Sequence, residues 1–174
     1  LGSTSFKAAV YDRDLDLLGS GAAPLEYGFA EGGCVDLPVK TAESAFRKGI
    51  AEALRSASVE PQSVRAVSIT SQAQTFTILD EHDRPKIPFI SWQDSRAART
   101  CTAMQQEGCL ADIAGHASFG ELLAALQVTI LVHLRRTRRD LIAPTDRVFH
   151  LPSYFVYLLS KRFVVDVNLA AMSG

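Results

Sequence analysis

The chain opens with Leu1-Gly2-Ser3-Thr4-Ser5-Phe6-Lys7, and this stretch decides how the rest of the sequence is interpreted. Its small and hydroxyl-bearing residues are typical of a tight turn, and the run at residues 6–11 then predicts a strand. Such a turn leaves backbone N–H groups and hydroxyls pointing outward with little side-chain bulk around them. Because stacked amide dipoles form a concavity that binds anions, the turn is a candidate phosphate site.

Two common phosphate motifs do not fit this turn. A Walker A loop ends in Gly-Lys-Ser/Thr before a helix, and a dinucleotide fingerprint needs several glycines, whereas Gly2 is the only glycine here and a strand follows. The alternative is an ordinary hairpin turn that uses Gly and Ser for their backbone tolerance. No strand and no acidic residue precede the turn, which predicts that the chain lacks a segment upstream.

Composition is typical of a globular domain. The 174 residues, 47% of them hydrophobic, predict about one domain with a real core. With 18 basic and 19 acidic residues the formal net charge is −1, which gives no reason to expect binding to nucleic acid or to an acidic membrane. Residues 122–134 are too short to span a bilayer and predict a buried helix. Three cysteines without a C-x-x-C pair predict reduced thiols in a cytoplasmic protein.

Periodicity predicts an α/β chain with a mixed sheet. Thr41 is expected to cap a first helix, whose apolar positions are Phe46, Ile50, Ala53 and Leu54. Further helices are expected from Asp94 to about residue 106, over residues 119–136 and from Pro152. The expected strands are residues 6–11, 17–22, 64–69, 75–79 and 87–92, with a short extended end at residues 163–166.

Polar residues gather in two loops at predicted strand ends, where open α/β sheets bind ligands. Gln72 and Gln74 offer the donors and acceptors that a polyol needs, and Trp92 offers a flat apolar face for sugar carbons. Asp94 can accept from hydroxyls, and it also stands where a helix N-cap belongs. Ordinary loop glutamines and a core Trp92 are the alternatives. The four histidines lack the spacing of metal ligands, so no metal site is predicted from His82, His116, His133 and His150.

Four segments together resemble the N-terminal part of the FGGY family of carbohydrate kinases, which includes xylulokinases and glycerol kinases. Residues 1–7 resemble the family's opening D-x-G-T/S-T/S-x-x-K/R, the first phosphate motif of the sugar kinase, actin and Hsp70 superfamily. Residues 68–74 (SITSQAQ) resemble its S-x-Q-x-x loop, and residues 88–96 (PFISWQDSR) resemble its P-x-I-x-W-x-D-x-R segment. Residues 151–174 resemble its helix followed by L-T-G-x-x-x-T-D…A-S. The four segments fit in order and spacing and span nearly the whole chain.

The resemblance implies an incomplete RNase H-like domain of the actin/hexokinase/Hsp70 superfamily and phosphorylation of a sugar or polyol hydroxyl with ATP and Mg²⁺. Residues 1–174 would be a partial N-terminal, substrate-binding domain. The nucleotide-binding domain would belong to the remainder of the kinase chain, and a homodimer is open. By this resemblance the ATP phosphates would lie against Gly2, Ser3, Thr4, Ser5 and Lys7. The sugar or glycerol would contact Gln72, Ala73, Gln74, Trp92 and Asp94.

The sequence also departs from the family pattern. The Asp that normally stands before Leu1 and helps to hold magnesium is absent, so no metal ligand is expected, and the general base is expected beyond Gly174. Leu159-Ser160-Lys161 replaces L-T-G. Where this chain has Ala73-Gln74, glycerol kinases have Arg-Glu and xylulokinases have Met-His. The chain matches neither pair, so ketopentoses, deoxy sugars and glycerol all stay possible substrates.

We therefore expect a piece of a sugar kinase that cannot turn over unaided. The alternative is a catalytically inactive kinase-like module that binds a sugar or a partner. A kinase further requires that the opening turn and Trp92 face one shared cleft.

Overall fold

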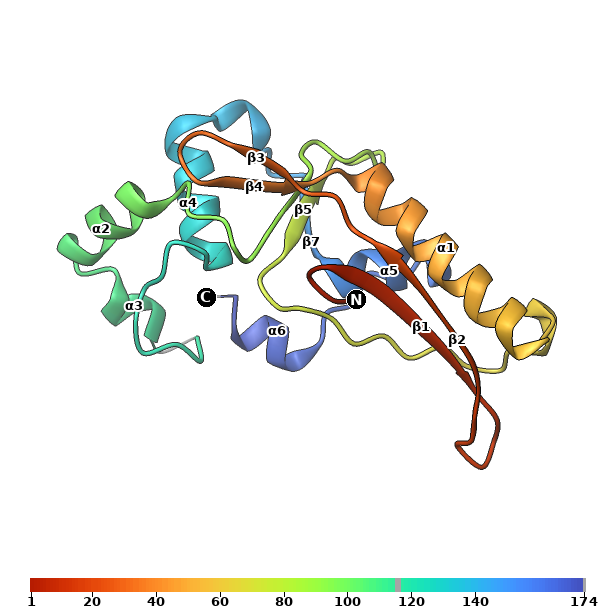
Figure 1. The fold of residues 1–174 in the computed structure, drawn as a ribbon. Coiled ribbons are helices and arrows are strands. Elements are labelled where there is room, and N and C mark those ends of the chain that lie inside the picture. Colours follow the sequence, from red (N-terminus) through yellow and green to blue (C-terminus); the bar gives the residue numbers. More distant parts are fainter. Residues whose placement is uncertain (115–116, 174) are drawn as a thin grey trace. The chain divides into compact units, whose positions relative to one another are not determined.

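The computed structural model describes residues 1–114 and 117–173 and divides the chain into two compact units. The first unit comprises Leu1–Tyr27 and Leu37–Gln72. The second comprises Gly28–Asp36 and Ala73–Gly174. Both units mix helices and strands, which agrees with the predicted α/β class (Figure 1).

A β-hairpin and one long helix build the first unit. Strands β1 (Ser5–Tyr11) and β2 (Leu17–Pro24) pair antiparallel, with Ser5 opposite Pro24, which confirms the predicted hairpin. Helix α1 (Val39–Ala57) lies along this hairpin (Figure 1). Alternation along β1 buries Phe6 and leaves Lys7 exposed, because successive side chains of a strand point to opposite faces.

Small residues let α1 approach β2 at backbone distance. The buried positions of α1 are Ala42, Ala45, Gly49 and Ala53, which recur at helical spacing. A Cβ added at Gly21 would lie 2.4 Å from the carbonyl oxygen of Gly49, so only glycine fits at this crossing. The larger apolar residues predicted for this face, Phe46 and Ile50, are only partly buried.

The start of α1 corrects the prediction for Thr41. The helix begins at Val39 after Pro38, and no side chain caps it. Proline fixes its own φ near −65°, and Pro38 has φ −58°, so the ring sets the entry to the helix in place of a hydroxyl cap.

The strand predicted at residues 64–69 is wrong. These residues follow a short 3₁₀ helix (Pro61–Ser63), form no strand and are mostly exposed. A strand needs a neighbour for its backbone groups, and no segment of residues 1–114 or 117–173 forms a ladder with residues 64–69.

A five-stranded sheet forms the centre of the second unit, in the order β3-β4-β6-β5-β7. Strand β5 lies between β6 and β7 and pairs antiparallel with each of them. The strands expected at residues 75–79 and 87–92 contain β5 and β6, whereas β3, β4 and β7 were not predicted. The bounds are β3 (Gly28–Ala30), β4 (Cys34–Leu37), β5 (Phe76–Leu79), β6 (Phe89–Ile90) and β7 (Arg147–His150).

Five α-helices and one 3₁₀ helix (Arg139–Leu141) complete the described part of the second unit. Two of the helices start later than predicted: α2 begins at residue 98 and not at Asp94, and α4 begins at residue 127 and not at 119. The bounds are α2 (Ala98–Gln106), α3 (Leu110–Ala114), α4 (Gln127–Thr137), α5 (Leu151–Ser160) and α6 (Val167–Ala171). Residues 163–166 form no strand, and Asp166 instead caps α6 by accepting from Asn168 N and Leu169 N.

Buried side chains from strands and helices make the core of this unit. One cluster joins the sheet to α4, and a second joins α2 to the segment before α4. The first consists of Phe76, Ile78, Ile87, Ile90, Ala97, Ile130 and Leu134. The second consists of Cys101, Met104, Leu122 and Leu126. Across residues 1–114 and 117–173, no helix combines the length and apolarity that a membrane span requires.

Candidate functional site

Two backbone hydrogen bonds hold the opening turn against the loop that contains Gln72. The backbone nitrogen of Leu1 donates to the carbonyl oxygen of Thr70 at 2.6 Å, and Gln72 N donates to Leu1 O at 3.1 Å. In a parallel strand pair, one residue bonds in this way to the two residues on either side of its neighbour, so Leu1 is bonded as if it lay in a strand parallel to residues 70–72. The predicted phosphate turn and the first predicted sugar residue therefore lie side by side within the first unit.

Side chains continue this contact. Ser3 Oγ donates to Gln72 Oε1 at 2.8 Å, and Gln72 Nε2 donates to the Tyr27 hydroxyl at 3.2 Å. Burial raises the pKa of Tyr27, and the hydrogen bond from Gln72 opposes that rise. Tyr27 was not predicted as a site residue, because it follows β2 in an irregular connection where neither period nor motif marks it.

The predicted phosphate residues present their backbone to solvent. Gly2, Thr4 and Lys7 are exposed. Within the described part of the chain the N–H groups of Gly2 and Thr4 donate to no acceptor, whereas Thr4 O accepts from Leu25 N at 3.0 Å. A Cβ at Gly2 would lie 3.0 Å from Ser5 O, so the turn is too tight for a larger residue without a small shift. Outward N–H groups without side-chain cover are what an anion needs.

In the second unit, the loop after β6 carries the only tryptophan. Trp92 is 44% exposed, so the core alternative for it is wrong. Its backbone nitrogen donates to Thr75 Oγ1 at 3.1 Å, and the fully buried Thr75 also accepts from Leu151 N through its carbonyl oxygen. Thr75, the residue before β5, thus fixes the backbone at Trp92.

Asp94 is buried within an ion pair and does not cap a helix, because Ala97 stands at the N-cap of α2. Its carboxylate accepts from Val35 N at 2.7 Å and from Arg96 N and Nε at 2.9 Å. The Arg96 guanidinium also pairs with Asp36. Burial opposes the charge of Arg96, but the hydrogen bond to Asp94 and the charge of Asp36 outweigh it and raise the pKa of Arg96. The carboxylate of Asp94 is therefore engaged by protein donors.

Gln74 is also engaged by the protein. Its backbone is left-handed, with φ 61°, and its side chain is buried. Nε2 donates to Met172 O at 2.6 Å, and Oε1 accepts from Gln127 N at 2.8 Å, which satisfies a free N–H in the first turn of α4. Ala73 beside it is partly buried. Gln74 thereby joins the segment before β5 to α4 and to the end of α6.

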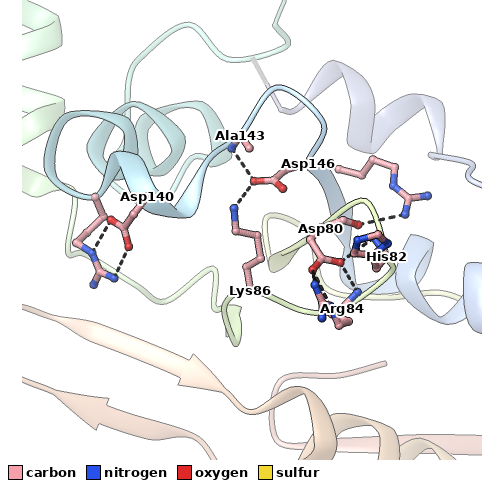
Figure 2. A network of polar contacts seen from close by, with 9 residues as sticks. Asp80, His82, Arg84, Lys86, Asp140, Ala143 and Asp146 are labelled. Atoms are coloured by element: carbon pink, nitrogen blue, oxygen red, sulfur yellow. Dashed lines mark hydrogen bonds and ion pairs between the residues drawn. The ribbon is translucent and has the colours of Figure 1, made fainter.

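Figure 2 shows a polar network around the turn after β5. Asp80 accepts from the backbone N–H and the guanidinium of Arg84, and these hydrogen bonds, the backbone one first, hold the pKa of Asp80 below its usual value. Lys86 Nζ lies 2.6 Å from a carboxylate oxygen of Asp146. These carboxylates are paired with cations, so the network fastens loops and offers no unpaired general base.

Candidate metal ligands do not converge. Within the described residues, no three His, Cys, Asp or Glu side chains are grouped as a metal site. His133 Nδ1 lies 3.0 Å from Thr100 Oγ1, and His150 Nε2 lies 2.9 Å from Ser173 Oγ. His82 is exposed, and His116 lies outside the described residues.

The predicted site residues therefore fall into two groups. Residues 2–5, Lys7 and Gln72 belong to the first unit, and Ala73, Gln74, Trp92 and Asp94 belong to the second. The bond between Ser3 and Gln72 brings together a predicted phosphate residue and a predicted sugar residue. A cleft shared by the turn and Trp92 stays a prediction.

Known proteins resemble the chain in sequence and in fold. Glycerol kinase 2 of Pseudomonas aeruginosa is 31% identical over 108 residues, which are 62% of this chain and 21% of that protein. The xylulose kinase structure from Lactobacillus acidophilus has a TM-score of 0.89 at 17% identity, and the match covers 99% of this chain and 34% of that one. The Plasmodium falciparum glycerol kinase structure with ADP has a TM-score of 0.75 at 18% identity, covering 92% and 33%.

These likenesses confirm the predicted fold class, because the solved sugar kinases with the same α/β fold have the actin/hexokinase-like architecture. The chain spans about a fifth of the length of the curated relative and a third of the solved chains. The model of the N-terminal domain of the FGGY carbohydrate kinases matches residues 1–174. On this match, the chain belongs to the FGGY family of carbohydrate kinases, and its residues correspond to the family's N-terminal domain.

Proposed function

We propose that the chain takes part in ATP-dependent phosphorylation of a hydroxyl on a sugar or polyol. Residues 1–174 supply a phosphate turn and part of the sugar pocket, and the rest of the kinase supplies the nucleotide clamp and the general base beyond Gly174. Support comes from the family match and from the share of its relatives that the chain spans. A cytoplasmic location and a homodimer stay predictions.

The observation that carries this proposal is the hydrogen bond from Ser3 to Gln72. Phosphoryl transfer is mostly positioning and charge neutralisation, so a phosphate site and an acceptor-hydroxyl site must be held together by rigid contacts. The turn and the Gln72 loop share two backbone hydrogen bonds and one side-chain bond. These contacts support the proposal, because they hold the predicted phosphate turn next to one predicted sugar residue within the first unit.

The residues take separate roles under this proposal. The exposed N–H groups of Gly2 and Thr4, with Ser3, Ser5 and Lys7, receive the phosphates. Gln72, Ala73 and the exposed Trp92 are assigned to sugar contact by the family resemblance alone. Gln74 and Asp94 contribute by fixing these loops, since protein donors and acceptors engage both side chains. MgATP is the proposed co-substrate, and no metal ligand is assigned because the described carboxylates form no metal cluster.

A coupled assay that detects ADP tests the proposal. The complete protein is expected to consume ATP with at least one of glycerol, xylulose and gluconate, the substrates in the names of its relatives and neighbours. Residues 1–174 alone are expected to show no turnover. The Gly2→Ala variant is expected to lower activity, because the turn must shift slightly to place a Cβ 3.0 Å from Ser5 O, whereas Gly120→Ala is the control, since nothing lies within 4 Å of its Cβ.

Two results would overturn the proposal. Appreciable turnover by residues 1–174 alone would show that the base lies within them. Sugar binding by the complete protein without any ATP consumption would instead favour the inactive binding module.

A further inference from the structure

Exposed apolar side chains gather in the connection between α5 and α6 of the second unit. Phe163, Val164 and Val165 are 55%, 46% and 50% exposed, and Val167 at the start of α6 is 75% exposed. Phe163 also packs against Phe149 of the edge strand β7, with ring centroids 4.6 Å apart, so the connection is held on the surface of this unit. A contiguous exposed apolar run of this kind marks a candidate contact surface.

The backbone of this connection is unpaired as well. Within the described residues, the N–H and C=O groups of residues 163–165 take part in no hydrogen bond. Asp166, which follows them, has the extended dihedral angles φ −67° and ψ 140°. Aromatic and β-branched residues favour strands, and a segment with free backbone groups can pair with a strand of a partner.

The sequence Arg162-Phe163-Val164-Val165-Asp166 is complementary to its own reverse. When two copies pair antiparallel about Val164, Arg162 of each lies opposite the partner's Asp166, and Phe163 lies opposite the partner's Val165. Opposite charges and aromatic–β-branched pairs both stabilise such a pairing. Arg162 is exposed and forms no ion pair with any described residue. The cap of α6 uses Oδ1 of Asp166 and leaves Oδ2 for the partner's Arg162.

We propose that residues 162–166 form an antiparallel strand pair with the same residues of a second copy of this chain. Charge complementarity favours a second copy, because the cation and the anion stand at equal distances on either side of Val164. A stable interface buries more than about 1,000 Å², and two five-residue strands supply less, so we expect a weak dimer that forms as the concentration rises. This dimer does not depend on the kinase activity.

Disulfide formation at residue 164 of the complete protein tests the register. Arg162 N already donates to Ser160 Oγ at 3.2 Å, so residues 163 and 165 make the backbone bonds of the pair. The two copies of residue 164 then form a non-hydrogen-bonded pair with Cα atoms about 4.5 Å apart, a separation that a disulfide can bridge. Val164→Cys is therefore expected to give a covalent dimer on a non-reducing gel, with its disulfide located by mass spectrometry. Val167→Cys, which is more exposed but lies away from its counterpart in this register, is the control and is expected to give no dimer beyond that of the wild type.

Charge reversal in the Val164→Cys background tests the ion pairs. Arg162→Glu and Asp166→Lys each place like charges opposite one another, so each variant alone is expected to lose most of the covalent dimer. An equal mixture of the two variants restores opposite charges at both positions, so the mixed dimer is expected to return to the level of Val164→Cys. Recovery in the mixture also shows that the loss of the α6 cap in Asp166→Lys leaves this surface folded.

Analytical ultracentrifugation gives a second readout, in which Val164→Lys is expected to weaken the dimer about tenfold by placing two cations opposite each other. No disulfide in Val164→Cys, or equal yields in the single charge variants and their mixture, would overturn the proposal. A dimer that Val164→Lys leaves unchanged would place the interface elsewhere and overturn it too. A monomer whose residues 163–165 are protected from amide exchange would show that another part of the complete kinase covers them. None of these readouts uses ATP turnover, so their failure leaves the proposed function standing.

Discussion

Replacing Arg96 by methionine is expected to destabilise the second unit by about 3 kcal/mol. Removing one partner of a buried ion pair costs roughly 3–5 kcal/mol, because the other charge is left without compensation. The Asp94 side chain has no exposed surface, and that of Arg96 is 16% exposed, so water cannot replace the guanidinium. Val35 N and the backbone N–H of residue 96 remain as donors, which places the cost at the lower end of that range.

Urea unfolding followed by tryptophan fluorescence measures this loss. Trp92 is the only tryptophan and lies two residues from Asp94, so the signal reports on this loop. Arg99→Met is the control, since Arg99 is exposed and takes part in no ion pair among the described residues, and its effect is expected to stay within about 0.5 kcal/mol.

A second substitution separates lost charge compensation from lost packing. In the Arg96→Met background, Asp94→Asn is expected to recover much of the stability, because a neutral amide leaves no charge buried. A loss below about 1 kcal/mol for Arg96→Met, or an Asn variant that lowers stability further, would refute the assignment of Asp94 to a buried ion pair that supports the Trp92 loop.

Three further changes test other contacts. Gly21→Ala is expected to cost more than about 2 kcal/mol in urea unfolding, because its Cβ would lie 2.4 Å from Gly49 O and α1 would have to move; an unchanged midpoint would contradict this packing. Gln74→Ala is expected to speed amide hydrogen exchange in α6, because the hydrogen bond from Gln74 Nε2 to Met172 O at the end of α6 is lost. Unchanged protection of α6 would argue against this hydrogen bond. Burial lowers the pKa of His150 below 6.5, so the unfolded chain takes up the proton first; stability is fully present above about pH 6.5 and falls on acidification, by at most about 1.4 kcal/mol per pH unit. His150→Gln, compared with His82→Gln, is expected to flatten this slope in pH-dependent unfolding, and an equal slope would exclude His150 as its source.

Local signals predicted the elements that depend on local contacts. The hairpin at residues 6–22 was predicted from two strand-like runs on either side of a polar turn. Its two strands are neighbours in the sequence and pair with each other. Helix α5 was expected from Pro152 and begins one residue earlier, with proline in its first turn, where its missing N–H costs nothing.

Elements that depend on distant partners could not be predicted in the same way. Residues 64–69 have the composition of a strand but no ladder partner among the described residues. Asp94 has the intrinsic preference of an N-cap, yet Arg96 and a backbone N–H from β4, 59 residues away, engage its carboxylate. Propensity is a weak prior that such contacts override.

The candidate site shows the same division. Motifs identified Ser3 and Gln72 separately, but their hydrogen bond joins residues 69 positions apart, and no spacing rule contains it. Tyr27 was missed entirely, because a lone tyrosine after a strand carries no periodic signal. The contact between Tyr27 and Gln72 can be recognised only from the three-dimensional structure.

The predicted sugar ligands differ in how strongly hydrogen bonds to the rest of the protein hold them. Gln74 holds a left-handed backbone and uses both atoms of its amide on Met172 and Gln127, so a change there alters the docking of α4 and α6 before it alters any ligand contact. The backbone nitrogen of Trp92 donates to Thr75 Oγ1, and the residue is 44% exposed. Substitutions at the exposed Gln93 are therefore expected to cost the fold little, whereas substitutions at Gln74 must be compensated at both Gln127 and Met172.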